Sequence, residues 1–176
     1  GQTNAEATGL AAGQYWVEVS DANGCSDVAN VTLVNPPVLS VTATVTSSFN
    51  GEDISCNGES DGSVAAAATG GSGAYSYEWY DDAALTSLIG QSTAAATNLP
   101  ADMYWVEVTD ANGCTASASV EVTEPPALTL SLAITSNYNG RDISCNGAND
   151  GQVEATVNGG TGTYYYNWYT DAAYTV

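Results

Sequence analysis

Short runs in which apolar and polar residues alternate recur along the chain, and clusters of Gly, Asn and Asp separate them. The helical pattern, with apolar residues three and four positions apart, is missing. Alternation with a period of two is typical of strands that bury one face, and Gly, Asn and Asp are the residues of turns. The pattern therefore predicts an all-β protein.

The runs between residues 38 and 126 predict about seven strands. The best defined are 39–47, 63–69, 75–80, 104–110 and 115–122, and a weaker pair lies between 85 and 99. Asn112-Gly113 predicts the tight turn of a closing hairpin, because Asn-Gly readily adopts positive φ angles. Short strands with short connections predict an immunoglobulin-like or fibronectin-like β-sandwich, with a small Greek-key barrel as the alternative.

Alternation also assigns side chains to faces. The expected core consists of Tyr75, Tyr77, Trp79, Tyr104, Val106, Val108, Ala116, Ala118, Val120 and Val122. The opposite faces carry Glu78 and Tyr80 on one strand, and Trp105 and Glu107 on another. If these two strands are neighbours, aromatic and carboxylate groups share one exposed surface.

The sequence repeats with a period of 89 residues. Tyr-Trp-Val-Glu-Val at 15–19 returns at 104–108, and Asp-Ile-Ser-Cys-Asn-Gly at 53–58 returns at 142–147. Sliding the chain by 89 positions aligns 87 residues without a gap, and 47 of them are identical. Such a period indicates tandem structural repeats.

Paired prolines mark the boundaries of the repeat. Asn35-Pro36-Pro37 and Glu124-Pro125-Pro126 each follow a strand pattern and remove two backbone donors in a row. They predict one complete unit at 38–126, preceded by the C-terminal half of a unit at 1–37 and followed by the N-terminal half of another at 127–176. We expect a longer array, in which neighbouring repeats of the same chain are partners.

The charge of the chain restricts its other partners. Asp and Glu number 20 against one basic residue, Arg141, which gives a net charge of −19. Nucleic acid is excluded, because phosphate binding requires Lys and Arg, and no apolar stretch is long enough for membrane insertion. A hydrophobic content of 44% with 11 Tyr and 4 Trp argues against disorder.

Catalysis has little support in this composition. The chain has no His and no Lys, so it lacks the commonest general base and the amine nucleophile. Glu78 and Glu107 could imitate the carboxylate pair of a glycosidase, but exposed carboxylates are expected in so acidic a chain. We therefore expect no enzyme activity.

Two cysteines occur in each unit: Cys56 and Cys114 in the complete one, with Cys25 and Cys145 as their repeat mates. Pairing is their simplest use, and it indicates an oxidising, extracellular compartment. A Cys25–Cys56 bridge would span a long extended path, so Cys56–Cys114 is the preferred pair, and Cys25 and Cys145 would pair outside this segment. One objection is that a plain sandwich places Cys56 and Cys114 at opposite ends, unless a reversal at Asn50-Gly51 carries Cys56 back.

Oxygen-bearing side chains gather in two stretches of the unit. They are Asp53, Asn57, Glu59 and Asp61 in the first stretch, and Asp110 and Asn112 in the second. Ca²⁺ takes such ligands and would relieve the charge repulsion, but Asp, Asn and Gly are equally the residues of turns, and the spacing of an EF-hand is absent. Both interpretations stand at this point.

Aromatic residues on the acidic face form a candidate binding surface. Its members are Tyr80, Trp105, Glu78 and Glu107, with Trp16 and Tyr169 as repeat mates of the two aromatics. They could stack against sugar rings of surface glycans or contact other copies of a filament. The alternative is ordinary cross-strand packing of half-exposed aromatics.

Five motifs in a fixed order resemble the SprB repeat, found in very large surface adhesins of Bacteroidota such as gliding adhesins. They are Ile-Ser-Cys-Asn-Gly-Glu-Ser-Asp-Gly-Ser (54–63), Gly-Gly-Ser-Gly-Ala-Tyr-Ser-Tyr-Glu-Trp (70–79), Leu99 before Tyr104, Asp-Ala-Asn-Gly-Cys (110–114) and Glu-Pro-Pro-Ala-Leu (124–128). The family pattern has Gly where Asp102 stands, and Gly13 keeps it. The resemblance implies type 9 secretion, display at the cell surface, and a role in cell adhesion or gliding motility.

Three functions remain as hypotheses. The first is a rigid stalk or fibre, in which each unit is a bead joined to the next by a short Pro-Pro linker. The second is a module that binds a glycan or a protein through the acidic and aromatic face, with calcium as a candidate cofactor. The third is an accessory domain of a carbohydrate-active enzyme.

Overall fold

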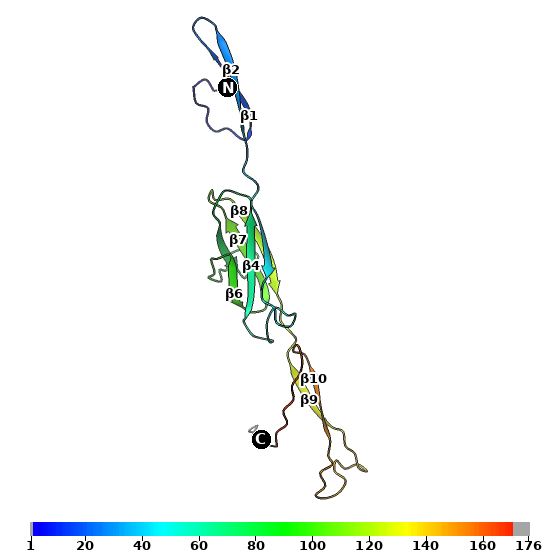
Figure 1. The fold of residues 1–176 in the computed structure, drawn as a ribbon. Coiled ribbons are helices and arrows are strands. Elements are labelled where there is room, and N and C mark those ends of the chain that lie inside the picture. The colour runs from blue at the N-terminus through cyan, green and yellow to red at the C-terminus, as the bar shows by residue number, and fades with distance from the viewer. Residues whose placement is uncertain (1, 171–176) are drawn as a thin grey trace.

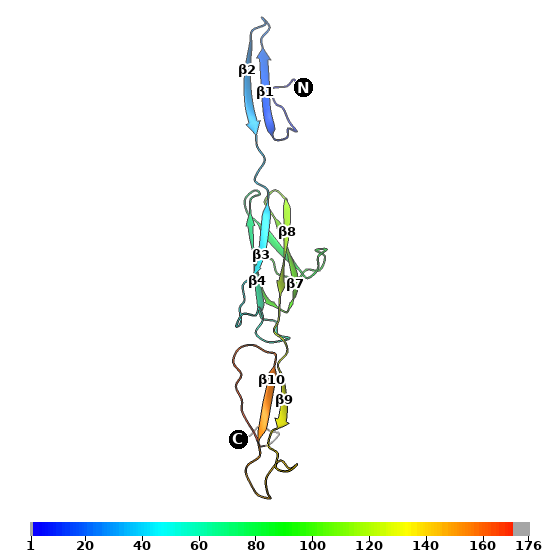
Figure 2. The same ribbon diagram turned by 90° about the vertical axis from the view of Figure 1, so that its right-hand side faces the viewer.

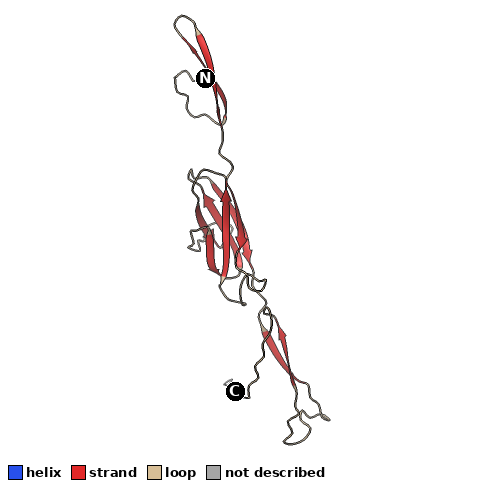
Figure 3. Cartoon of the chain, viewed as in Figure 1, coloured by secondary structure: helices blue, strands red, loops and turns tan. Residues whose placement is uncertain are grey.

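The structure is a computed structural model that describes residues 2–170, and its regular elements are all strands (Figure 3). The strands form three bodies that follow one another along an elongated chain (Figures 1 and 2). A hairpin comes first, a body of two sheets follows, and a second hairpin comes last. The all-β fold class is confirmed. Among the described residues no helix could cross a membrane.

The central body, residues 38–126, is called the middle unit below. One of its sheets has the order β3-β4-β6, formed by β3 (Ser40–Val45), β4 (Gly62–Thr69) and β6 (Ala95–Leu99). The other has the order β5-β7-β8, formed by β5 (Ser76–Tyr80), β7 (Asp102–Thr109) and β8 (Thr115–Val122). Every pairing is antiparallel. The strand order resembles the A-B-E and C-F-G sheets of immunoglobulin-like sandwiches.

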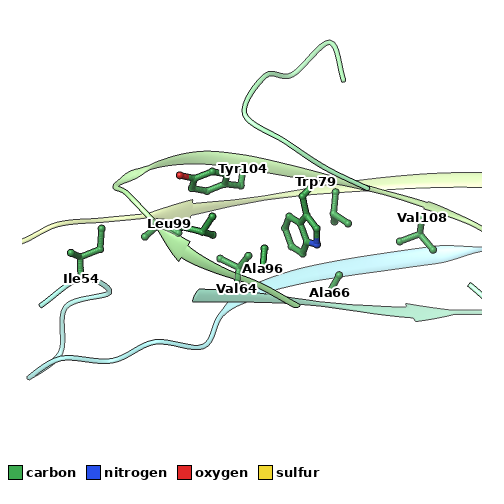
Figure 4. Close-up of a cluster of buried hydrophobic side chains, with 10 residues drawn as sticks. Ile54, Val64, Ala66, Trp79, Ala96, Leu99, Tyr104 and Val108 are labelled. Carbon is green, nitrogen blue, oxygen red and sulfur yellow. The ribbon is translucent and has the colours of Figure 1, made fainter. Parts of the chain in front are cut away.

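The core lies between these two sheets (Figure 4). Of the expected core residues, Trp79, Tyr104, Val106, Val108 and Val122 are buried, and Tyr75, Tyr77, Ala118 and Val120 pack against them from partly buried positions. The other sheet contributes Val64, Ala66, Ala96 and Leu99, and the loop after β3 contributes Ile54. Full burial of one large apolar side chain stabilises a fold by about 1.5–3 kcal/mol.

The connection between β5 and β6 differs from the expected pair of strands. Only β6 forms there, so the middle unit has six strands. The residues between β5 and β6 fold back along β5. They form an isolated β-bridge between Leu88 and Tyr80 and a hydrogen bond of 3.0 Å from Ile89 N to Trp79 O. A tight bend makes this return irregular, because Asp82 accepts the amides of Thr86 and Ser87 and the backbone φ of Leu85 is +56°.

The two outer hairpins reproduce parts of the middle unit. β1 (Gly13–Ser20) and β2 (Ser26–Leu33) correspond to β7 and β8 with identical bounds after the 89-residue shift. β9 (Thr129–Ile134) and β10 (Val153–Asn158) correspond to β3 and β4 in the same way, although β10 is two residues shorter. The counterpart of β5, residues 165–169, is not a strand.

The Asn-Gly turns at 50–51 and 112–113 have different geometries. Asn50 and Gly51 both have positive φ, at 53° and 97°, and form the expected chain reversal between the bonded residues Phe49 and Glu52. Between β7 and β8, by contrast, only Gly113 has positive φ. The Gly113 amide donates to the carbonyl of Asp110 at 3.0 Å, so this turn is a longer loop than the tight turn expected from Asn112-Gly113.

Candidate functional site

The acidic and aromatic face lies on the paired strands β5 and β7. Their register places Glu78 opposite Glu107 and Tyr80 opposite Trp105, so the two strands are neighbours as the prediction required. Glu78 is exposed, whereas Trp105 and Glu107 are half-buried. Like charges directly opposite each other in a sheet are destabilising, so this arrangement costs stability.

Tyr80 was expected on the exposed surface, but the structure buries it. Only 6% of it is exposed, because the return of the chain after β5 forms the Leu88 bridge beside it. Its hydroxyl donates a hydrogen bond of 2.9 Å to Glu78 Oε2. This hydrogen bond, followed by desolvation and the charges of Glu78 and Glu107, raises the pKa of Tyr80. The geometry of Tyr80 supports the alternative interpretation, ordinary cross-strand packing.

The repeat mates of these aromatics lie in the outer bodies, where they are more exposed. Trp16 on β1 is 63% exposed, against half-burial of Trp105. Tyr169, the counterpart of Tyr80, is 40% exposed. The structure therefore gathers Glu78, Glu107, Tyr80 and Trp105 on one face but places Trp16 and Tyr169 elsewhere.

Asp110 organises the upstream end of the middle unit, where the chain enters from Pro37. Its Oδ1 accepts the amides of Asn112 and Cys114, each at 2.9 Å, and its Oδ2 accepts the amide of Ser72 at 2.9 Å. The hydrogen bond from Cys114, with those from Asn112 and Ser72, lowers the pKa of Asp110 against the effect of its burial. A Cβ at Gly71 would lie 2.7 Å from Asp110 Oδ2, so this position requires glycine.

The downstream end, where the chain leaves towards Pro125, contains the other acidic residues. Asp53 Oδ2 accepts the amide and the hydroxyl of Thr123 at 2.9 and 2.7 Å. Asp61 Oδ1 accepts the amide of Ser55 at 3.1 Å, and hydrogen bonds from Ser55 lower the pKa of Asp61. Glu59 is exposed. Two of these carboxylates thus fasten the loop between β3 and β4.

The residues proposed as calcium ligands fall into two groups that occupy opposite ends of the unit. Asp53, Asn57, Glu59 and Asp61 lie downstream, whereas Asp110 and Asn112 lie upstream. Within residues 2–170 no three Cys, Asp or Glu side chains come together in a way that could hold a metal ion. The six residues therefore do not come together at one place, and the carboxylates of Asp53, Asp61 and Asp110 accept hydrogen bonds from backbone amides.

Cys56 and Cys114 also lie at opposite ends, and their preferred pairing disagrees with the structure. Cys56 precedes Asn57, which bonds to Pro125 downstream, whereas Cys114 follows the upstream turn. The eight residues of β8 separate these ends by about 27 Å, and a disulfide requires Cα atoms within about 7 Å. The reversal at Asn50-Gly51 does not carry Cys56 back. The four described cysteines are all exposed and free of disulfides.

The linker between the middle unit and residues 127–170, called the C-terminal segment below, is bonded on both sides. Asn57 Nδ2 donates to Pro125 O at 3.1 Å, and the Gly58 amide donates to Glu124 Oε2 at 2.7 Å. On the other side, the Gly160 amide donates to Pro126 O at 2.7 Å. Its repeat mate, the Gly71 amide, donates to Pro37 O at 2.8 Å.

The open apolar faces of the outer bodies were not identified from the sequence. An open cleft lies where the C-terminal segment meets the middle unit. Its lining includes Leu128, Leu130, Leu132, Val157, Tyr166 and Trp168, together with Cys56 and Asn57. The repeat contained the signal, because Val41, Ala43 and Trp79, the counterparts of Leu130, Leu132 and Trp168, belong to the core of the middle unit.

Comparison with protein families gives one match, the SprB repeat, at residues 48–84 and 137–173. The two matched stretches begin 89 positions apart, which is the shift that aligns the sequence with itself. Each stretch runs from the loop before β4, or its counterpart, through the segment of β5 and beyond. A comparison with curated proteins gives no match.

Proposed function

The chain belongs to the SprB repeat family, and from this premise we propose that it is a rigid, non-catalytic part of the extracellular stalk of a cell-surface adhesin. The family is a structural repeat of surface adhesins in Bacteroidota, and its members stand beside further repeats in tandem. In this proposal the segment sets the length and direction of the stalk, because a stiff series of sandwiches bends little.

The linker supports this proposal most strongly, because it is hydrogen-bonded to the bodies on both of its sides. Pro125 O accepts from Asn57 of the middle unit, and Pro126 O accepts from Gly160 of the next body. Proline fixes its own φ, so few torsions remain free between the two bodies. Pro125 is fully buried, which also ties the linker to the end of the middle unit. A joint of this kind favours stiffness over free rotation.

The binding-module alternative receives less support from the structure. A stacking platform needs both aromatics open to a ligand, and Tyr80 is buried with its hydroxyl bonded to Glu78. Trp105 is half-buried. A stalk requires neither side chain to be accessible.

Arrays of two, four and eight copies of residues 38–126 test the stalk role by electron microscopy. A rigid stalk predicts thin rods whose length rises linearly with copy number, by roughly 30 to 45 Å for each unit. Replacing Asn57 by Ala in every copy removes the bond to Pro125 and should increase bending while each unit stays folded. A length that grows only as the square root of copy number, or a compact globule, would refute the proposal.

A further inference from the structure

The middle unit has one exposed cysteine at each of its two ends. Cys56 lies at the downstream end, beside the linker to the C-terminal segment, and Cys114 lies at the upstream end, after the turn between β7 and β8. Residues 38–126 contain no third cysteine. In a tandem array, each joint therefore has one cysteine on either side: Cys56 of the preceding unit and the counterpart of Cys114 in the following unit.

The turn that contains Cys114 packs against the loop that follows β4. The Ala111 amide donates to Ser72 O in this loop at 3.2 Å. The Gly71 amide of the same loop donates to Pro37 O at 2.8 Å. One loop thus holds both the Cys114 turn and the linker from the preceding body, so the turn has a fixed place at the joint.

The C-terminal segment has the same loop, bonded to its own linker. The Gly160 amide donates to Pro126 O at 2.7 Å, as the Gly71 amide donates to Pro37 O. The glycines at 159, 160 and 162 have φ of 74°, 66° and 82°, and those at 70, 71 and 73 have φ of 76°, 62° and 84°. Because the two loops share one backbone conformation, the second loop offers the same packing site to the turn of its own unit.

This second loop lies against the downstream end of the middle unit, where the two bodies meet (Figures 1 and 2). A Cβ at Gly162 would lie 3.3 Å from Asn50 Nδ2 of the middle unit. Thr161 lines one cleft together with Cys56. A turn that packs on this loop as the Cys114 turn packs in the middle unit therefore enters the cleft beside Cys56.

Cys56 is itself held in place at this joint. The Glu59 amide donates to Cys56 O at 3.1 Å, and the two residues after Cys56 bond to Pro125 O and to Glu124 Oε2. A disulfide requires Cα atoms within about 7 Å of each other. Two turns that are each fixed next to one linker keep the same separation at every joint, so one specific pair is favoured throughout an array.

We propose that Cys56 of each unit forms a disulfide with the counterpart of Cys114 in the unit that follows it. One Sγ–Sγ bond forms from two thiols, and their two protons and two electrons reduce the disulfide of an external thiol–disulfide oxidant to two thiols. An oxidising extracellular compartment supplies such an oxidant. The inference rests on the tandem arrangement of the units and goes beyond the stalk role, because the bond can form at a stiff or at a flexible joint.

Joined copies of residues 38–126 are suitable for the test. Every residue of the hydrophobic core lies between Val41 and Val122, so each copy contains its whole core. Direct joining keeps the linker, because Val38 of the second copy takes the place of Ala127. Two copies and four copies are refolded at low concentration with reduced and oxidised glutathione, and the cysteines outside protein disulfides are counted by intact mass.

The cysteine count separates the possible pairings. We expect two cysteines outside protein disulfides in both proteins, Cys114 of the first copy and Cys56 of the last, because only these lack a neighbour across a joint. A count of zero would show that each unit closes its own bond. A count that doubles from two copies to four would show that no bond forms. Either result would overturn the proposal.

Single substitutions in the two-copy protein identify the bond. Cys56→Ser in the first copy should abolish the disulfide and leave three cysteines outside protein disulfides. The same substitution in the second copy is the matched control and should leave the disulfide intact and one cysteine unpaired. The opposite result would contradict the proposed pair. These counts do not depend on how far the joint bends, so failure of the stalk role in electron microscopy would be a separate result.

Discussion

The residues Tyr-Trp-Val-Glu-Val occur twice, in β1 at 15–19 and in β7 at 104–108, and they share local structure but not burial. Both copies lie in antiparallel hairpins of identical length. The tyrosine hydroxyl bonds to a carbonyl four residues upstream in each, at 2.8 and 3.0 Å. Yet Val17 is 55% exposed and Val106 is buried. Local sequence is sufficient for the hairpin, whereas the core requires the other half of the unit.

The segment around the repeated pattern Tyr-x-Tyr-x-Trp, at 75–79 and 164–168, shows the converse. In the middle unit Ser76–Tyr80 form β5 and pair with β7, and Trp79 is completely buried. In the C-terminal segment the counterparts of β5 form no strand, and Trp168 is 56% exposed. The strand β5 thus depends on a distant partner, because its hydrogen bonds and its apolar contacts both come from elsewhere in the unit.

The largest expected effect is on the unfolding free energy of the middle unit, and it should differ between Trp79 and Trp168. Trp79→Ala should destabilise the middle unit by about 3–5 kcal/mol, because it leaves a cavity in the core. Trp168→Ala should change the unfolding free energy of the middle unit by less than about 0.5 kcal/mol. Urea denaturation followed by circular dichroism measures both. Equal losses in the two variants would show that the C-terminal segment is already packed like the middle unit.

A smaller effect concerns pH and the two equivalent aspartates Asp110 and Asp21. The pKa of Asp110 is lowered below its ordinary value of 3.8, so its contribution to stability is present at neutral pH and is lost as pH falls through the folded-state pKa. Asp110→Asn should therefore lower the Tm of the middle unit most at about pH 7, and the difference from wild type should shrink towards about pH 2.

Asp21→Asn is the matched control for this experiment. Asp21 accepts the amides of Asn23 and Cys25 as Asp110 accepts those of Asn112 and Cys114, but it belongs to the β1–β2 hairpin. The control should leave the Tm of the middle unit unchanged at every pH. A difference between wild type and Asp110→Asn that stays constant with pH would refute the role given to the charge of Asp110.

The smallest effect is expected from removal of divalent cations. Asp53, Asp61 and Asp110 are already bonded to backbone donors, and the candidate ligands lie at opposite ends of the unit. The Tm in EDTA at low salt should therefore equal the Tm with added calcium. A fall of several degrees in EDTA would support the calcium hypothesis and contradict this expectation.

Periodic features of the fold could be predicted from the sequence. Alternation of apolar residues identified the bounds of β7 and β8 to within two residues and the face on which Val106 and Val108 are buried. It also placed Glu78 and Glu107 on the faces opposite the core, and the structure pairs their strands, β5 and β7. These predictions succeeded because they depend on side-chain alternation along one strand and on a repeat that occurs nearly twice.

The remaining features depend on contacts between distant segments. Tyr80 was expected on the surface and is buried, because an irregular segment without alternation folds back along β5. The pairing of Cys56 with Cys114 depended on which end of the sandwich each loop occupies, and that is a property of strand direction. The bonds that fix the linker involve Asn57 and Gly160, whose residue types have no distinctive pattern.

Hydrogen exchange measured on one dilute, monomeric sample compares the two copies of Tyr-Trp-Val-Glu-Val most directly. Their intrinsic exchange rates are nearly equal because their sequences are identical, so any difference in protection comes from the structure around them. Burial of β7 in a complete sandwich predicts strong protection at 104–108 and exchange at least tenfold faster at 15–19. Equal protection of the two stretches in the monomer would contradict the conclusion that burial of this strand depends on packing against the other sheet of a unit.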